Sequence, residues 1–274
     1  MNKIFAIAKK EFMDNWRNKW IIAISAIFLI LTVVVSYFTK GEWQNLSSTI
    51  VGMMSFVELL IPILGLMLGY ATIAGEKERG SLAILLSYPV RRWEILIGKF
   101  LGLSCVIASS IFIGFGIAGV IIGINVKEVK WLEYFYFIAI SILLGIVYIA
   151  ISIMLSSIFK KRATAMGGAI FTWFFFSMIW GIILFGLLII IYKSNPFQIV
   201  NENFTAPNWF YFLSALNPVS AFESLIYLNV TPIRGAIPIN YPSFYNNPFL
   251  FSMLFIWIIL SLAVAYLFFR NKDI

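Results

Sequence analysis

The sequence predicts an all-α integral membrane protein with six transmembrane helices in a single domain, residues 1–274. Hydrophobic residues make up 61% of the chain and charged residues only 12%, about half the share that soluble domains carry. The apolar residues gather in six runs, each long enough at about 1.5 Å per residue to cross about 30 Å of hydrocarbon. Runs of this kind satisfy their backbone hydrogen bonds in a membrane only as helices. So little polar sequence remains that there is no room for a soluble catalytic domain.

An amphipathic segment, residues 1–19, precedes the spans. Phe5, Ala8, Phe12 and Trp16 fall on one side of a helix, and charged side chains occupy the other sides. The pattern is typical of an interfacial helix that lies among lipid headgroups and helps to form a docking surface, or of a basic flank that only orients the first span. The predicted spans are residues 20–38, 50–74, 100–124, 134–159, 163–192 and 248–269.

The positions of Lys and Arg predict the orientation of the chain, because cytoplasmic segments of membrane proteins are enriched in both residues. With the N-terminus inside, fifteen of the twenty basic residues lie in cytoplasmic segments and five in external ones. We therefore expect a multi-pass protein of the cell membrane with both termini in the cytoplasm. The formal charge of +8 reflects this orientation and requires no nucleic-acid partner.

Residues 75–99 form a polar interruption between the second and third spans, with the sequence GEKERGSLAILLSYPVRRWEILIGK. This loop carries eight of the chain's 32 charged side chains, which must lie in water because charges are costly in hydrocarbon. Strong helix formers follow Gly80 as far as Pro89, which ends that helix and is well placed to start the next one. We expect a small helical knob on the cytoplasmic side. Its predicted apolar edge consists of Leu82, Leu85, Leu86 and Trp93.

The predicted external segment, residues 193–247, holds six of the chain's nine prolines, which excludes long helices from most of it. Within residues 215–229, ALNPVSAFESLIYLN, Asn217 and Pro218 can open a short helix that carries Glu223. Aromatic residues flank this helix. We expect either a re-entrant element that dips into the outer leaflet or a loop that rests at the aromatic belt of the membrane.

Glu58 is the only charged residue within a predicted span, and it lies close to Pro62. A charge at such depth usually faces a cavity or a partner helix, although a side chain near the outer interface can also reach the headgroups. The sequence therefore offers five candidates for a translocation path or gate. They are Glu58, Pro62, Asn217, Pro218 and Glu223.

The sequence contains no His, and Cys105 is its only cysteine. This composition removes haem ligation by His, most zinc sites and His-based acid–base catalysis. We expect no catalytic residue, no metal site and no cofactor bound by this chain.

The arrangement resembles the ABC-2 type exporter permeases: a basic amphipathic entry helix, six spans, an acidic-basic first cytoplasmic loop and an external re-entrant element before the last span. The loop carries the most specific likeness, in which Glu78, Gly80, Leu82, Leu85-Leu86, Pro89, Arg92 and Gly98-Lys99 match the family's order and spacing. Within the family, GYATIAGEKERG and LLSYPVRRWEILIGKFLG are similar to the branch associated with maturation of the copper centre of nitrous-oxide reductase.

This resemblance implies a half-transporter that is not itself an enzyme. Family members pair two permease chains with two cytoplasmic ATPase chains that bind ATP and Mg²⁺, and this sequence has no GxxxxGK[ST] phosphate loop of its own. The partners expected are therefore an ATPase subunit, a second permease copy, with a homodimer expected, and membrane lipids. The knob corresponds to the family's coupling helix. Its residues expected to face the ATPase are Glu76, Lys77, Glu78, Arg79, Gly80, Leu82, Leu85, Pro89, Arg91 and Arg92.

Two other classes of protein remain open. An ATPase-independent secondary transporter or channel also fits six spans, but usually shows more ionisable residues within the membrane, or inverted repeats with broken helices. A membrane-embedded enzyme needs a nucleophile with its base, or a metal site. The absence of His argues against the enzyme, although a Ser-Lys pair stays formally open.

Overall fold

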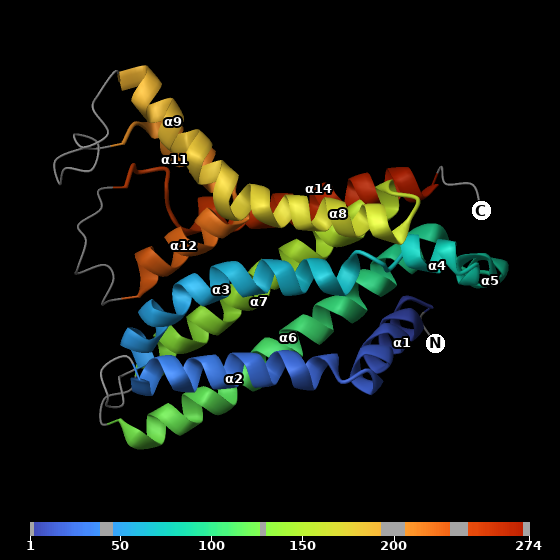
Figure 1. The fold of residues 1–274 in the computed structure, drawn as a ribbon, viewed down its shortest axis with the longest axis horizontal. Coiled ribbons are helices and arrows are strands. Elements are labelled where there is room, and N and C mark those ends of the chain that lie inside the picture. The colour runs from blue at the N-terminus through green and yellow to red at the C-terminus, as the bar shows by residue number, and fades with distance from the viewer. Residues whose placement is uncertain (1–2, 39–45, 127–129, 193–205, 231–240, 271–274) are drawn as a thin grey trace.

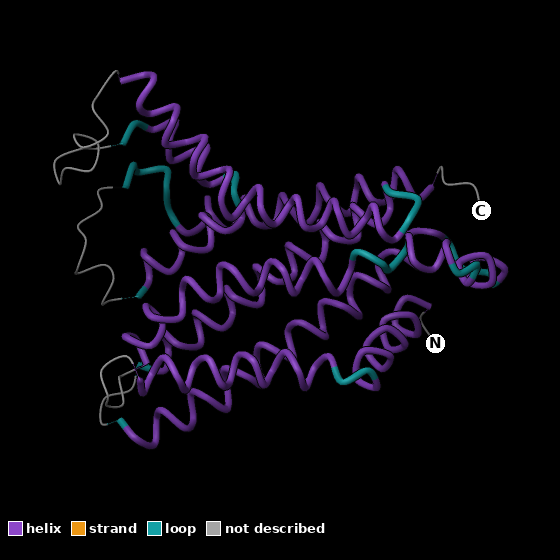
Figure 2. Tube along the Cα trace, in the orientation of Figure 1, coloured by secondary structure: helices purple, strands orange, loops and turns teal. Residues whose placement is uncertain are grey.

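The structure, a computed structural model, describes residues 3–38, 46–126, 130–192, 206–230 and 241–270. Within these ranges every regular element is a helix (Figure 2). The helices are α1 (Lys3–Arg17), α2 (Trp20–Phe38), α3 (Leu46–Gly69), α4 (Ala74–Glu78), α5 (Ser81–Ser87), α6 (Arg92–Asn125), α7 (Trp131–Ile158), α8 (Arg162–Phe174), the π-helix η1 (Phe175–Ile179), α9 (Trp180–Tyr192), α11 (Asn208–Ala215), α12 (Pro218–Asn229) and α14 (Asn247–Arg270).

Six helical segments are long and apolar enough to cross a membrane, which confirms the predicted class. They are Trp20–Tyr37, Ser47–Glu78, Arg92–Asn125, Trp131–Ile158, Arg162–Ile191 and Asn247–Arg270. The third segment begins at Arg92 rather than at residue 100. Hydropathy marks only the apolar part of a helix, whereas the backbone hydrogen bonds of the same helix continue beyond it.

The most buried span is α7, which packs against α3, α14 and α6. Its contact with α3 depends on two glycines four residues apart. A Cβ atom at Gly65 would lie 2.9 Å from Cβ of Tyr148, and a Cβ atom at Gly69 would lie 2.8 Å from Oγ of Ser152. Both distances are too short for any larger residue, so the backbone of α3 lies directly on α7. Small residues at this spacing are a common basis for close helix packing in membranes.

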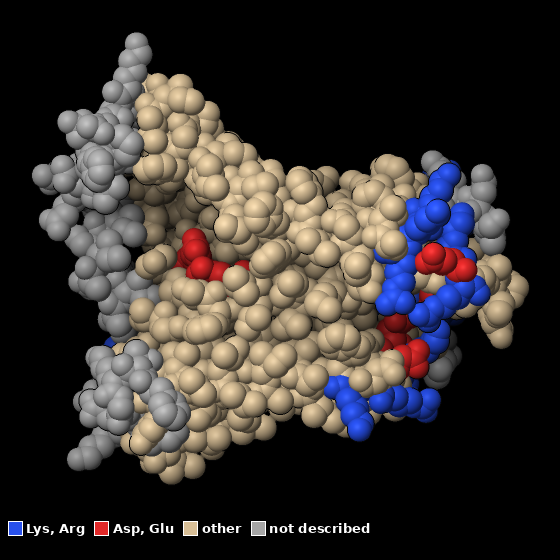
Figure 3. Space-filling model, viewed as in Figure 1, with Lys and Arg blue, Asp and Glu red and all other residues tan. Residues whose placement is uncertain are grey.

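The spans lie roughly along the long axis of the molecule, and α1, α4 and α5 lie together at one end (Figure 1). Lys and Arg side chains gather at this same end, whereas the rest of the visible described surface is almost free of them (Figure 3). We call it the basic end. The separation of charge along the bundle follows the pattern used above to predict orientation.

The entry helix α1 is packed against α6 rather than lying alone. A Cβ atom at Gly98 would lie 2.7 Å from Cβ of Ile7, and a Cβ atom at Gly102 would lie 2.7 Å from the carbonyl oxygen of Ala8. The two glycines therefore admit α1 to the surface of α6. Phe5 and Trp16 point away from this contact and remain exposed, as expected of side chains that face lipid.

The fifth span consists of three consecutive helical parts, α8, η1 and α9. The π-helix interrupts the span near its middle, and α9 departs from the line of α8 (Figure 1). A π segment inside an α-helix is a recognised cause of such a bend. Beyond the bend α9 contacts α11, and η1 itself contacts α12.

Candidate functional site

The knob predicted from residues 75–99 is a pair of short helices, α4 and α5, joined by a sharp turn. Gly80 has φ of 74°, a left-handed conformation that glycine adopts without steric cost. Ser87 ends α5 because Pro89 holds the preceding residue, Tyr88, in an extended conformation. The next helix begins at Arg92 and not at Pro89, so the predicted helix start is wrong by three residues.

The start of α4 is fastened to α7. Oγ of Ser156 accepts hydrogen bonds from the backbone N–H groups of Ile73 at 2.9 Å and Ala74 at 3.0 Å. N–H groups in the first turn of a helix have no partner within the helix, so this hydroxyl supplies one. The break between α3 and α4 is therefore held in place by the central helix of the bundle.

The exposed apolar edge of the knob differs from the predicted one. Leu82 is only 3% exposed and packs inward, whereas Ile84 and Tyr88 are 65% and 61% exposed. Leu82, Leu85 and Leu86 share one face of α5 at helical spacing, and that face is turned towards the protein. The edge available to a partner consists of Ile84, Tyr88 and Trp93.

Lys99 links three elements at the basic end. Its Nζ lies 2.7 Å from Oε1 of Glu11 on α1 and 2.7 Å from Oε1 of Glu76 on α4. The Lys99 side chain is 1% exposed, and the two carboxylates are largely buried around it. A buried charge is tolerated only when it is paired and hydrogen-bonded. The cluster therefore fixes α4 to both α1 and α6.

Arg91 and Arg92 have different surroundings, although the sequence assigned them the same role. The backbone N–H of Arg91 donates to Oε2 of Glu94 at 2.7 Å, and its side chain is exposed. Arg92 instead donates through Nη1 to the carbonyl oxygens of Phe269 at 2.6 Å and Arg270 at 3.1 Å. Arg92 thus supplies hydrogen bonds to the last carbonyl groups of α14. The side chain of Arg91 is instead exposed on the surface of the basic end.

The remaining predicted knob residues lie close to α8 or to water. Glu78 and Arg79 are exposed, and Lys77 is half-buried. Oε2 of Glu78 accepts a hydrogen bond from the backbone N–H of Arg162 at 3.3 Å. The knob therefore contacts the start of the fifth span as well as α1 and α6.

At the opposite half of the molecule, α11 and α12 form a helical hairpin. Oδ1 of Asn217 accepts from the N–H of Val219 at 2.9 Å and Pro218 occupies the first helical position, as the sequence predicted for the start of this helix. Nδ2 of Asn217 donates to the carbonyl oxygen of Phe176 in η1 at 2.8 Å. The hairpin tip therefore lies beside the middle of the fifth span, which favours the dipping element over a surface loop.

Two indole groups hold the same tip from either side. Nε1 of Trp180 donates to the carbonyl oxygen of Leu213 at 3.2 Å, and Nε1 of Trp257 on α14 donates to that of Leu216 at 2.8 Å. Leu213 lies in the last turn of α11 and Leu216 directly follows that helix, so both indole groups donate to carbonyl oxygens at its C-terminal end. The tip is thus secured by side chains from the fifth and sixth spans.

A cavity of about 280 Å³ lies between α3, the fifth span and the hairpin. The side chains of Glu58 and Glu223 both line it, so the cavity brings two carboxyl groups from different helices together. Burial raises the pKa of Glu223, because a charged carboxylate is less stable away from water. Acidic side chains are visible in a hollow in this half of the molecule (Figure 3). The polar residues that complete the lining are Ser55, Ser177, Ser220 and Asn217.

The structure therefore brings together Glu58, Asn217 and Glu223 from the predicted path residues. Pro62 is buried in α3 one turn from Glu58 and is not among the residues that line the cavity. It still acts on the site, because proline has no N–H to donate to the carbonyl group of Glu58.

A comparison with models of protein families shows to which family the chain belongs. The family described as ABC-2 family transporter protein matches residues 5–274. The chain belongs to the ABC-2 transporter family. It is 31% identical over an alignment of 291 residues to the probable ABC transporter permease protein NosY of Pseudomonas aeruginosa, and the alignment covers 100% of each chain. It is 32% identical over 290 residues to the protein of the same name from Stutzerimonas stutzeri, with 99% of each chain covered. The predicted resemblance is confirmed, and this ABC-2 permease is a membrane protein with several transmembrane helices.

Two features of this ABC-2 permease had no counterpart in the predicted site. The pairing of Lys99 with Glu11 was missed, although a lysine followed at once by a long apolar run is a signal that its charge needs a partner. The approach of α3 to α7 was also missed, although G-x-x-x-G stands plainly at Gly65 and Gly69.

Proposed function

We propose that this ABC-2 permease is the transmembrane subunit of an exporter and moves its cargo with ATP hydrolysed by a separate subunit. That subunit, which binds ATP and Mg²⁺, docks at the basic end of the permease. The basic end and both termini face the cytoplasm. The observation that carries the proposal is the knob of α4 and α5, which protrudes with an exposed apolar edge and is tied through Lys99 to α1 and α6. The family to which the chain belongs supports a partner ATPase, and the sequence has no phosphate loop of its own.

The proposed mechanism is mechanical. The ATPase changes its contacts with the knob as it closes on ATP, and a conformational equilibrium can shift only through such a difference in contacts. Movement of α4 displaces Glu76 and therefore acts on Lys99 and Glu11, so α6 and α1 follow. A second copy of the permease completes the transporter. The cavity at Glu58 and Glu223 belongs to the translocation path of the cargo or to its external gate.

Reversal of the charge at Arg91 tests whether the knob binds the ATPase. We expect Arg91→Glu to reduce the amount of ATPase that copurifies with the permease by about tenfold, because a reversed charge at an interface is repelled by groups that attracted the original one. The measurement is the ratio of the two subunits after purification in detergent. The melting temperature of the permease alone should not change, since the Arg91 side chain is exposed.

Arg92→Glu serves as the contrast. Its side chain holds the end of α14, so reversal should lower the melting temperature as well as the yield of complex. Lys130→Glu, at the other end of the bundle, should leave copurification unchanged. Full copurification with Arg91→Glu would remove the knob from the proposed interface.

We further propose that transport by this permease serves the maturation of the copper centre of nitrous-oxide reductase. The resemblance of its first loop to that branch supports the assignment, as does the likeness to two proteins named NosY. The acidic cavity suits a cationic or amine-bearing cargo, because a carboxylate placed away from water is stabilised by a positive ligand.

Replacement of both cavity carboxyl groups tests this path. In a host that makes the reductase and lacks its own permease, we expect Glu58→Gln/Glu223→Gln to lower the copper content of the purified reductase to the level seen without any permease. The amide side chains have nearly the same size as the carboxyl groups but cannot carry a negative charge. Glu133→Gln, an acidic residue of α7 outside this cavity, should behave as the parent chain. A normal copper content in the double variant would show that the cavity is not on the path.

An ATPase-independent secondary transporter or channel is the second candidate function. The two carboxyl groups in the cavity favour it, because acidic side chains within the membrane part of a protein often mark proton relays in pumps and transporters. Copper loading of the reductase in cells that lack the partner ATPase would support this alternative. Its loss there would support the exporter.

A further inference from the structure

The break between α3 and α4 has no cause in its own residues. The turn that separates the two helices, residues 70–73, reads YATI and contains neither Pro nor Gly. Gly69 and Gly75 flank this turn, but within the described residues only Gly80 and Lys19 adopt a positive φ, so neither flanking glycine uses a conformation closed to other residues. Helices are also interrupted where a side chain enters the ladder of backbone hydrogen bonds. At this break such side chains come from α7.

Two serines of α7 take the places of backbone partners on either side of the break. Oγ of Ser152 donates to the carbonyl oxygen of Leu66 at 2.7 Å, in the last turn of α3. Oγ of Ser156 accepts from the N–H groups of Ile73 and Ala74, where α4 begins. Residues four positions apart lie on one face of a helix, so a single face of α7 caps both the end of α3 and the start of α4.

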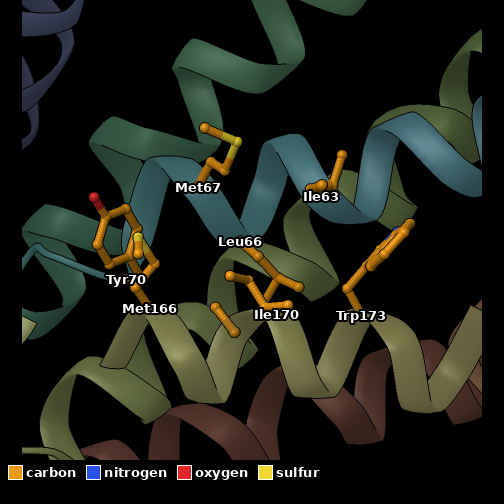
Figure 4. A pocket seen from close by; sticks show the side chains of 8 residues that line it. Ile63, Leu66, Met67, Tyr70, Met166, Ile170 and Trp173 are labelled. Carbon is orange, nitrogen blue, oxygen red and sulfur yellow. The ribbon is translucent and has the colours of Figure 1, made fainter. Parts of the chain in front are cut away.

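The two serines are not equally replaceable. In a continuous helix the N–H groups of Ile73 and Ala74 would donate to the carbonyl groups four residues earlier. At the break Ser156 is their acceptor instead, and both residues are 0% exposed, so water cannot take its place. Leu66 and Tyr70 lie one turn apart where α3 ends (Figure 4), and the N–H of Tyr70 also donates to the carbonyl oxygen of Leu66, at 3.1 Å. Loss of Ser156 therefore leaves more buried groups unpaired than loss of the other serine.

We propose that Ser152 and Ser156 are positioning residues for the knob. They interrupt what would otherwise be one long helix and fix the direction in which α4 leaves the bundle. Glu76 is the third residue of α4 and lies 2.7 Å from Lys99, so a shift at the break moves the ion cluster and the knob together. The inference rests on the proposed function in one respect, that the ATPase binds the knob.

Amide hydrogen exchange of the full-length permease in detergent tests the break directly. Exchange is measured by mass spectrometry of peptides that cover residues 70–75. We expect these residues to exchange at least about tenfold faster in Ser156→Ala than in the parent chain, because two buried N–H groups lose their acceptor. Ser152→Ala should give a smaller increase, since the carbonyl group of Leu66 keeps one partner.

Ser110→Ala is the matched control. Ser110 is also 0% exposed, but its Oγ donates to the carbonyl oxygen of Val106 within α6 itself, at 2.8 Å. Its replacement removes a buried hydroxyl away from the break, so residues 70–75 should exchange at the parent rate. Ser156→Thr keeps an acceptor hydroxyl at the break and should restore slow exchange.

The yield of copurified ATPase tests the positioning role, which a merely structural serine would not affect. The amount of ATPase is measured per mole of monodisperse permease, so that loss of folded protein does not count. We expect this ratio to fall about fivefold in Ser156→Ala, because the ATPase then binds only the fraction of molecules in which the knob is correctly placed. Ser110→Ala should keep the parent ratio, and Ser156→Thr should recover it.

Two outcomes would overturn the proposal. The first is unchanged exchange of residues 70–75 in Ser156→Ala. The second is a parent-like ATPase ratio in Ser156→Ala under conditions in which Arg91→Glu loses the ATPase, which would make the serines structural only. If Arg91→Glu also kept the ATPase, the proposed docking of the knob would fail instead, and the exchange rates would still decide whether the serines make the break.

Discussion

Replacement of Lys99 by Met is expected to lower the melting temperature of the detergent-solubilised permease by about 10 °C. The substitution leaves Glu11 and Glu76 as two buried carboxylates without their shared cation. Removal of one partner from a buried ion pair costs about 3–5 kcal/mol, because the remaining charge is left without compensation. We also expect loss of copper loading in the reductase assay described above, since α4 is no longer tied to α6. Lys10→Met, an exposed residue of α1, is the matched control and should change neither measurement.

The triple variant Lys99→Met/Glu11→Gln/Glu76→Gln separates stability from transmission of movement. With no charge left in the cluster, most of the lost melting temperature should return, because neutral side chains of similar size replace a buried ion pair at little cost. Copper loading should remain low. If the triple variant loaded copper normally, the cluster would be structural only, and an unchanged melting temperature in Lys99→Met would contradict the buried geometry itself.

The second large effect is expected from Gly65→Leu. A side chain at this position meets Cβ of Tyr148 at 2.9 Å and the carbonyl oxygen of Gly145 at 3.1 Å, and neither atom can rotate away. Overpacking of a close helix contact costs about 1–3 kcal/mol or more. In this case it separates α3 from the central helix. We expect little monodisperse protein in size-exclusion chromatography and a lower melting temperature for the fraction that folds.

Gly186→Leu provides the control for a glycine replaced in a membrane helix. Nothing lies within 4 Å of a Cβ atom at Gly186, so leucine there should be tolerated. Equal yields of the two variants would mean that α3 and α7 are farther apart than the structure places them.

The sequence predicted those parts of the fold that depend on local chemistry. Six apolar runs gave six spans because hydrocarbon selects for length and hydrophobicity alone. Asn217 and Pro218 predicted the start of α12 because a helix start is set by neighbouring residues. The inward face of α5 was not predicted, since for Leu82 that direction depends on where the rest of the bundle lies.

The candidate site was predicted as a set of residues but not as an arrangement. Lys99 lies 88 residues from Glu11 and 23 residues from Glu76, so no local pattern links the three side chains. Glu58 and Glu223 were both candidates, yet nothing in either segment indicates that they share one cavity. Arg91 and Arg92 are adjacent and chemically identical, and only the position of the α14 terminus distinguishes them.

The π-helix in the fifth span determines which way the side chains that follow it point. A π segment holds one residue more than the α-helical turn it replaces, which rotates everything after it by about 100° relative to an uninterrupted helix. Without that rotation the indole of Trp180 would point well away from the carbonyl group of Leu213. The part of the fifth span beyond η1, α9, is therefore oriented towards the hairpin. The part before η1, α8, is oriented towards α3.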